Sequence, residues 1–285
     1  MKISTEIDSA ANKVGFEKAV ELVAKAGFDC WDFSMFQMCV FDWGKWELIK
    51  RGHPLEARDT ALALAEKLRK IGEKNGISCN QGHAPFPVSC EPILEYMPLS
   101  IECLAEAGGK ILIIHPDNNK SAEENAVMYN ELLPLAKRLG VTIATENMWN
   151  WYHDRDCAAP AACSSPEDFC RHIDVVNDKN FGACVDIGHA EMMGVKNGAA
   201  KMLEALGNRV IALHVHDNDL KHDNHQLPGA MLIDFDTVTA ALRKIDYKGE
   251  FTLECGTHLS GKTADNVFEG LKEMRQVPFD LAAKI

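Results

Sequence analysis

The sequence repeats one arrangement eight times, a short β-rich run followed by a longer helical pattern. The β-rich runs are residues 2–7, 29–35, 77–83, 110–116, 141–147, 182–189, 210–217 and 250–256. The helical patterns are residues 16–26, 55–75, 92–107, 121–139, 165–176, 197–206, 236–245 and 263–274. Strands separated by helices pair in parallel, because a parallel neighbour needs a long crossover. Eight such units without a linker predict an α/β protein, a single (β/α)8 barrel over residues 1–285.

The alternative architecture is an open α/β sheet with a small extra domain. Its commonest form binds a dinucleotide through a glycine-rich turn after the first strand. No G-x-G-x-x-G follows residues 2–7. The sequence therefore favours the barrel and predicts no nucleotide cofactor.

Composition excludes several classes of partner. The 285 residues carry a formal net charge of −12, which disfavours nucleic acid because a phosphate backbone repels an acidic chain. No apolar run approaches the ~18 residues of a membrane-spanning helix, so we expect no membrane partner. The 10 cysteines form no C-x-x-C pair. We interpret them as reduced, mostly buried thiols in a cytoplasmic protein.

Alternation within the later strands places ionisable residues on the barrel's inner face. Glu146, Asp186, His216 and Glu254 all fall late in their strands, opposite an apolar face that points toward the helices. Active sites of barrels lie at this end of the strands. Three carboxylates around one point would repel each other strongly in a low dielectric, and a divalent cation resolves this better than a purely structural polar cluster. Three oxygen ligands and one imidazole suit Mn²⁺, Mg²⁺, Co²⁺ or Zn²⁺.

Five motifs carry a resemblance to a known group of barrels. They are T-E-N at 145–147, V-D-I-G-H at 185–189, H-V-H-D-N-D at 214–219, D-N-H with Q-L-P-G at 223–229, and L-E-C at 253–255. Together they resemble the xylose-isomerase-like TIM-barrel superfamily. That group includes sugar isomerases and epimerases, inosose dehydratases and zinc-dependent abasic-site endonucleases.

The resemblance to the ketose 3-epimerases of that group implies roles for particular residues. It implies one divalent metal ion bound by Glu146, Asp186, His216 and Glu254, with His189 touching a substrate oxygen. It also implies that Glu146 and Glu254 are catalytic and move protons from opposite faces of the sugar. Those enzymes carry an arginine shortly after the histidine of strand seven, whereas this chain reads DLKHDNHQLPG there, so the substrate stays open.

Four further residues match positions that complete a three-zinc site in the endonucleases, namely His83, His115, Asp223 and His225. A second metal at these residues is one alternative. The other, which we favour, is that His83 and His115 contact substrate, as histidines there do in sugar-processing members.

Two long loops bear aromatic residues. Residues 149–166 are long for a loop between a strand and a helix and carry Trp149 next to Glu146, so Trp149 is a candidate to pack on a sugar. This segment is a lid over the site, a plug of the barrel top or a subunit contact. We expect residues 33–46 to serve packing or an interface. A homo-oligomer is therefore an open alternative.

These residues predict a carbohydrate enzyme. We expect a metal-dependent isomerase or epimerase of a sugar or sugar phosphate, which transfers protons through a metal-stabilised enediolate. The same groups could expel a β-hydroxyl, so a dehydratase or lyase acting on a keto-sugar or inosose is the first alternative. A second alternative is an abasic-site endonuclease: this chain has the ligand residues of such an enzyme but lacks the basic loops that would bind DNA. A non-catalytic subunit is a third alternative, but such a protein would not need four converging ligands.

Overall fold

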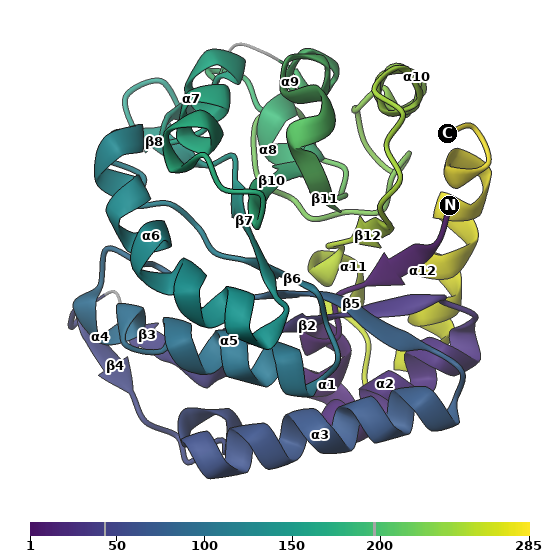
Figure 1. Ribbon diagram of the computed structural model, residues 1–285. Helices are drawn as coiled ribbons and strands as arrows, with labels where there is room; N and C mark the ends of the chain where they lie inside the picture. Colours follow the sequence, from purple (N-terminus) through teal and green to yellow (C-terminus); the bar gives the residue numbers. More distant parts are fainter. Residues whose placement is uncertain (43, 196–197) are drawn as a thin grey trace.

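The computed structural model describes residues 1–42, 44–195 and 198–285. In this part of the chain, eight parallel strands form a ring. Figure 1 shows helices arranged around these strands. The ring strands are β1 (Ile3–Thr5), β2 (Cys30–Ser34), β5 (Ser78–His83), β6 (Ile111–Ile113), β7 (Thr142–Glu146), β10 (Phe181–Asp186), β11 (Val210–His214) and β12 (Phe251–Leu253). Each falls within one of the predicted runs, except that β10 begins one residue before the run 182–189, and the predicted (β/α)8 barrel is confirmed.

Hydrogen bonding continues around the ring in the order of the sequence. Six strands form one sheet in the order β11-β10-β7-β6-β5-β2, and β1 pairs with β12. A bridge between Glu6 and Asp32 joins β1 to β2, and a bridge between Val215 and Leu253 joins β11 to β12. The carboxyl ends of all the ring strands therefore meet at one rim.

The helices are mostly those that the sequence predicts. They are α1 (Asp8–Val14), α2 (Phe16–Ala26), α3 (Arg58–Lys74), α4 (Glu91–Leu94), α5 (Met97–Glu106), α6 (Ala122–Leu139), α7 (Pro166–Val176), α8 (Ile187–Glu191), α9 (Ala199–Leu206), α10 (Phe235–Lys244), α11 (Gly256–Ser260) and α12 (Val267–Ala282), with short 3-10 turns at Phe36–Met38, Pro54–Glu56 and Gly207–Arg209. The predicted run 92–107 is divided into α4 and α5. The start of the predicted helix 197–206 lies outside the described residues.

Local signals set the ends of α6. The Ser121 hydroxyl accepts a hydrogen bond from the Glu124 amide, and the Glu124 carboxylate accepts one from the Ser121 amide, which completes a capping box. Gly140 ends the helix with a φ of 70°, a left-handed conformation that costs glycine little. Both ends are readable from the sequence because they depend on neighbouring residues only.

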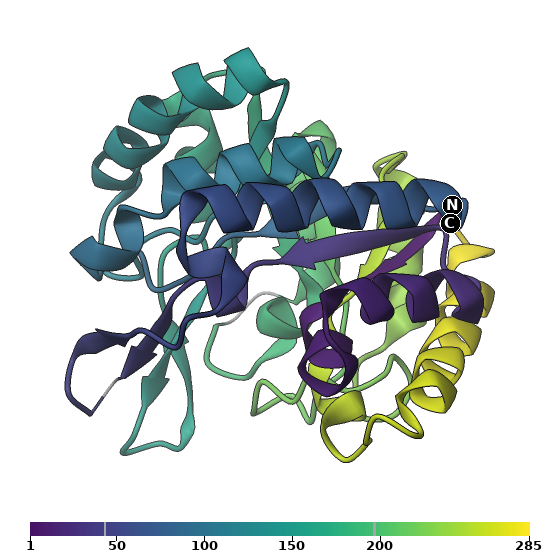
Figure 2. The same ribbon diagram turned by 90° about the horizontal axis from the view of Figure 1, so that it is seen from below.

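Both aromatic loops fold into β-hairpins, which the sequence did not predict. One hairpin pairs β3 (Val40–Asp42) with β4 (Glu47–Ile49), and the other pairs β8 (Trp149–Tyr152) with β9 (Cys157–Pro160). Figure 2 shows both hairpins projecting toward the same end of the molecule. The intervening residue 43, in the first of these loops, lies outside the described part of the chain.

The predicted two-sided strands are confirmed by the packing. Alternate strand residues such as Ile143, Val185 and Leu213 belong to the large core cluster shared with the helices. Their neighbours in sequence form a separate small cluster, made of Ile113, Ala144, Cys184 and Ala212. The small side chains of this second cluster lie inside the ring, below the rim that carries the ionisable residues.

In the described residues, no helix has the length and apolarity needed to cross a membrane. All of the cysteines have free thiols, and only Cys157 and Cys170 are partly exposed.

Candidate active site

The carboxyl ends of four neighbouring strands bring Glu146, Asp186, His214 and Glu254 together. One ligand-type atom from each lies within 4.8 Å of the others. The His214 Nδ1 atom is 3.1 Å from Glu146 Oε2 and 3.5 Å from Glu254 Oε2. We call these four residues the first group. Three carboxylates and one imidazole are the ligand types that the sequence predicts for a divalent metal.

The sequence predicted His216 for this group, whereas His214 has the ligand-type atom that lies within 4.8 Å of those of all three carboxylates. Both residues lie on the inner face of the chain, two residues apart, and both are buried. Parallel pairing sets Asp186 opposite His214, which is the last residue of β11. His216 lies one step further along the chain, with its Nε2 atom 3.2 Å from Asp186 Oδ1. Alternation identifies a face of a strand but not the height along the barrel axis, and the inter-strand register decides that height.

His216 belongs instead to a second group with His189, Asp223 and His225, whose ligand-type atoms also lie within 4.8 Å of one another. Asp223 is central, with its Oδ1 atom 3.4 Å from His216 Nε2 and its Oδ2 atom 3.1 Å from His225 Nε2 and 3.3 Å from His189 Nε2. The predicted set of His83, His115, Asp223 and His225 is therefore not one cluster.

His83 and His115 lie on the other side of the first group. Their Nε2 atoms are 2.9 Å apart, and they are 3.7 and 3.5 Å from Glu146 Oε2. With Glu146 they form a third group that could hold an ion. The structure therefore divides the four predicted second-metal residues between two locations.

Short-range hydrogen bonds hold the D-I-G-H segment in place. Asp186 Oδ1 accepts a hydrogen bond of 2.6 Å from the His189 amide, which caps α8 and turns the His189 ring toward the site. The Asn147 side chain links the end of β7 to the backbone of Asp186 through bonds of 2.8 and 2.9 Å. Because of these bonds, Asp186 lies in the first group while His189, three residues later, lies in the neighbouring second group.

A buried carboxylate that the sequence reading overlooked shapes the loop carrying Asp223 and His225. Asp217 is fully buried and accepts hydrogen bonds from the amides of Gly229, Met231 and Ile233 at 2.8 to 3.0 Å. Its backbone also pairs with Gln226. The position of Asp217 directly after H-V-H was a signal for this role. A carboxylate buried at the end of a strand needs several hydrogen-bond donors, and the following loop can supply them.

Several atoms of the first two groups are buried without a hydrogen-bond partner. They are Glu146 Oε2, Asp186 Oδ2, His214 Nδ1, His216 Nε2 and Asp223 Oδ1. A buried polar group left unpaired costs about 1–3 kcal/mol, so native structures rarely keep five such atoms in one place without a ligand. All five are of the types that bind divalent cations. The residues present therefore fit a metal ion.

The pKa values of two histidines in the second group also indicate that these residues fit a metal ion. Burial alone would lower the pKa of His189, but the carboxylates of Asp186 and Asp223 raise it well above its usual value. Burial opposes charge on His225 too, yet Asp223 raises its pKa to about 10. The imidazoles of His189 and His225 thus hold protons where a cation would supply the same positive charge, and metal binding would release those protons.

Glu146 shows the opposite shift. Burial alone would raise its pKa, but the imidazoles of His214, His115 and His83 hold it well below the usual value. The Glu146 carboxylate is therefore ionised although only 1% of its side chain is exposed.

A cavity of about 580 Å³ opens onto these groups. Its lining includes His83, His115, Glu146, His189, Asp223, His225, Glu254, Trp149, Glu6, Ser9, Phe36, Trp46, Phe86, Asn118, Asn150 and Gly256. Trp149 thus lies where the sequence expected it, at the start of the β8–β9 hairpin. Trp151 instead stacks on His222 and packs with the small cluster around Met192.

The sequence reading missed the aromatic wall formed by Phe36 and Phe86. Their rings meet at 5.5 Å, and both pack against His83 at 4.9 and 5.7 Å. Phe36 belongs to the segment 33–46, for which we expected packing or an interface. It also missed Glu6, although this residue falls late in the first predicted strand, the same signal that identified Glu146.

The fold and this rim of ligands define a (β/α)8 barrel of the xylose isomerase-like kind. The model of the family described as xylose isomerase-like TIM barrel matches residues 20–277, and the chain belongs to that family.

Relatives and solved structures agree with this placement. An uncharacterized protein of Methanocaldococcus jannaschii is 25% identical over 242 residues, which cover 78% of each protein. A D-tagatose 3-epimerase-like protein has a similar structure, with a TM-score of 0.68 at 21% identity over 97% of this chain and 99% of that chain. The IolI protein with a bound zinc atom superposes with a TM-score of 0.73 at 18% identity over 100% of this chain and 99% of that chain. At these identities the structural likeness shows the fold.

Proposed function

We propose that this protein is a divalent-metal-dependent isomerase or epimerase of sugars. One observation carries the proposal: Glu146 and Glu254 flank His214 within a group of partnerless ligand atoms that opens onto the cavity. Membership of the xylose isomerase-like family supports it. The names of the structural neighbours, which include a D-tagatose 3-epimerase-like protein and an L-ribulose 3-epimerase, support it further.

The metal site in this proposal consists of Glu146, Asp186, His214 and Glu254. When bound there, a divalent ion polarises the carbonyl of a hydroxy-ketone and so acidifies the neighbouring C–H. The ionised Glu146 carboxylate accepts a proton on one side of His214. Glu254 faces the same space from β12 and delivers a proton from the other side. Two carboxylates on either side of one carbon are what epimerisation requires.

The second group, His189, His216, Asp223 and His225, is our proposed site for a second ion. Its His216 Nε2 and Asp223 Oδ1 atoms lack partners, as in the first group. His83 and His115 then remain substrate contacts, because both line the cavity beside Glu146. Elemental analysis of the purified protein should find two divalent ions per chain when metal is supplied in excess.

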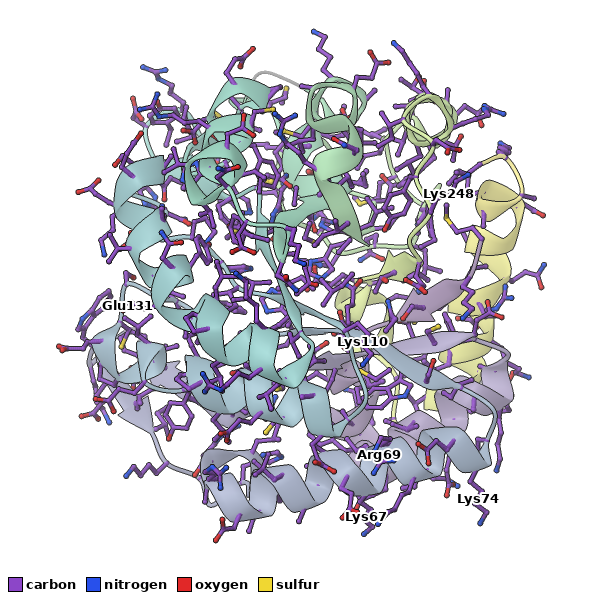
Figure 3. All side chains as sticks on the ribbon, in the orientation of Figure 1. Lys67, Arg69, Lys74, Lys110, Glu131 and Lys248 are labelled. Carbon is purple, nitrogen blue, oxygen red and sulfur yellow. The ribbon has the colours of Figure 1, made fainter. Side chains whose placement is uncertain are left out.

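The cavity favours an unphosphorylated sugar. Among the described residues that line it there is no lysine or arginine, the side chains that usually bind phosphate. Figure 3 shows Lys67 and Lys74 pointing outward from α3 and Lys248 at the periphery of the molecule. The exposed position of Lys67 and Lys248, with 63% and 77% of their side chains accessible, agrees with the picture.

The test is to load the protein with Mn²⁺, Co²⁺ or Zn²⁺ and incubate it with D-tagatose, D-fructose, D-allulose and an inosose. Chromatography then identifies the product, so that an epimer, an aldose or a dehydrated product separates the isomerase from the dehydratase or lyase alternative. If the fully loaded protein converts none of these compounds, the proposal is wrong.

The endonuclease alternative is favoured by one observation, the presence of several overlapping groups of ligand atoms along the rim. The described residues that line the cavity include no lysine or arginine. This argues against an endonuclease, since phosphate contacts dominate binding to DNA. Incubation of the zinc-loaded protein with an abasic duplex decides the matter, and we expect no incision.

A further inference from the structure

Glu6 lies on the same rim as the metal groups, directly after β1. Its amide donates a hydrogen bond of 3.0 Å to the carbonyl of Leu253, and it forms a bridge with Asp32 of β2. Leu253 is the last residue of β12 and precedes Glu254. Glu6 and Glu254 therefore follow the ends of two neighbouring strands, and both line the cavity.

The two carboxylate oxygens of Glu6 have different surroundings. Oε2 accepts a hydrogen bond of 2.9 Å from the Ser9 amide, in the first turn of α1. Oε1 is buried and has no hydrogen-bond partner, and only 3% of the residue is exposed. The capping of α1 explains the position of Oε2, but it gives no role to Oε1. Glu6 also belongs to none of the groups of described residues that could hold a metal ion.

A glycine leaves the approach to Oε1 open. Gly256 lines the cavity, and a Cβ atom added there would lie 2.7 Å from Ser9 Oγ and 3.9 Å from Glu6 Oε1. A side chain at position 256 would therefore come within contact distance of Glu6 Oε1.

The charges around Glu6 suit a neutral, hydroxyl-bearing ligand. Burial, together with the negative charges of Asp8 and Glu254, raises its pKa to about 7. No lysine or arginine forms an ion pair with Glu6 in the described residues. A carboxyl group in this state can accept a hydrogen bond from a hydroxyl group or donate one to it, whereas it would repel an anion.

We propose that Glu6 is a substrate-binding residue whose Oε1 atom hydrogen-bonds one hydroxyl group of the sugar, and that Gly256 keeps this contact accessible. The inference rests on the proposed function, because it assumes a polyhydroxylated substrate at the metal groups. It adds a specificity-determining contact on β1, on the side of Glu254 away from Glu146.

The experiment uses the metal-loaded protein with D-tagatose, D-fructose and D-allulose, followed by the monodeoxy analogues of the ketose with the lowest KM. Each analogue lacks one hydroxyl group. The variants are Glu6→Ala, which removes the carboxyl group, and Gly256→Ala, which obstructs the approach but keeps the bond between Glu6 and Ser9. Glu17→Ala is the matched control, because it makes the same substitution at a carboxylate of α2 that does not line the cavity.

We expect Glu6→Ala and Gly256→Ala each to raise KM about 10-fold, the factor for one hydrogen bond to an ionisable group. Glu17→Ala should leave KM within twofold of the unmodified protein. One monodeoxy analogue should show the same 10-fold penalty with the unmodified protein but no additional penalty with Glu6→Ala. This coupling would not appear if Glu6 only capped α1.

Should Glu6→Ala fail to fold for want of the cap, Gly256→Ala serves instead, because it leaves the Glu6 side chain unchanged. If the unmodified protein converts the ketose while these variants keep its KM and every analogue penalty unchanged, the role of Glu6 is refuted and the proposed function stands. If the unmodified protein neither binds nor converts any of the three ketoses, the proposed function fails, and this inference with it.

Discussion

The replacement of His214 or His216 by alanine gives a matched pair of perturbations. Both histidines lie on one chain face, two residues apart, and they are 1% and 0% exposed. We propose that they serve different groups, since His214 Nδ1 is 3.1 Å from Glu146, whereas His216 Nε2 is 3.4 Å from Asp223 as well as 3.2 Å from Asp186. Each substitution should therefore remove one ion and leave the other.

The size of the expected change in stability follows from the thermodynamic linkage between metal binding and folding. An ion present at 100 times its Kd stabilises the folded state by about 2.7 kcal/mol, which corresponds to roughly 5–10 °C in Tm for a chain of this size. The first group contributes three of the partnerless buried atoms, Glu146 Oε2, Asp186 Oδ2 and His214 Nδ1. Metal binding satisfies all three, so His214→Ala should abolish most of the Tm increase due to the first ion.

The assay combines elemental analysis with thermal unfolding at several metal concentrations. The unmodified protein should hold two ions and each variant one. His214→Ala should also lose sugar turnover, whereas His216→Ala should retain measurable turnover through the first group. Loss of turnover in His216→Ala together with a fully occupied first site in His214→Ala would show that His216 is the ligand and that our assignment is wrong.

The other predictions concern proton transfer, packing and pH. Glu146→Gln and Glu254→Gln should each lower kcat by at least about 100-fold at saturating metal, because an amide cannot take up the proton. Turnover of the unmodified protein in D2O should place deuterium on the carbon next to the carbonyl. Normal rates in both variants, measured by NMR, would contradict this prediction. Gly188→Ala should remove only the second ion, because a Cβ atom there would lie 1.9 Å from His216 Cε1, and elemental analysis checks it. The pKa of His225, raised to about 10, means that its contribution to the stability of metal-free protein is complete below about pH 6.5 and is lost as the pH rises toward 10. Urea unfolding in chelator should show this decline, and His225→Gln should reduce it; an identical pH profile in the variant would disprove the assignment.

The barrel was predictable because the signals that define it are local. Periodicity of two in the strands, helical spacing between them and caps such as Ser121 and Gly140 all depend on residues close in sequence. The same alternation predicted that Ala144 and Cys184 point away from Ile143 and Val185, as the two core clusters confirm. The inner face and the carboxyl end of the strands were enough to identify Glu146, Asp186 and Glu254 as neighbours.

Only the tertiary structure shows that His214, rather than His216, lies close to all three of those carboxylates. His214 and His216 have the same parity in the sequence, and the choice depends on the register of β11 against β10, a relation between segments that local spacing does not contain. The grouping of Asp223 and His225 with His189 likewise depends on the loop organised by Asp217, whose amide partners lie 12 to 16 residues away. The position of Glu6 in the lining of the cavity depends on closure of the ring between β1 and β12. Sequence patterns thus determined the fold and the kinds of ligand, while long-range packing determined which atoms meet.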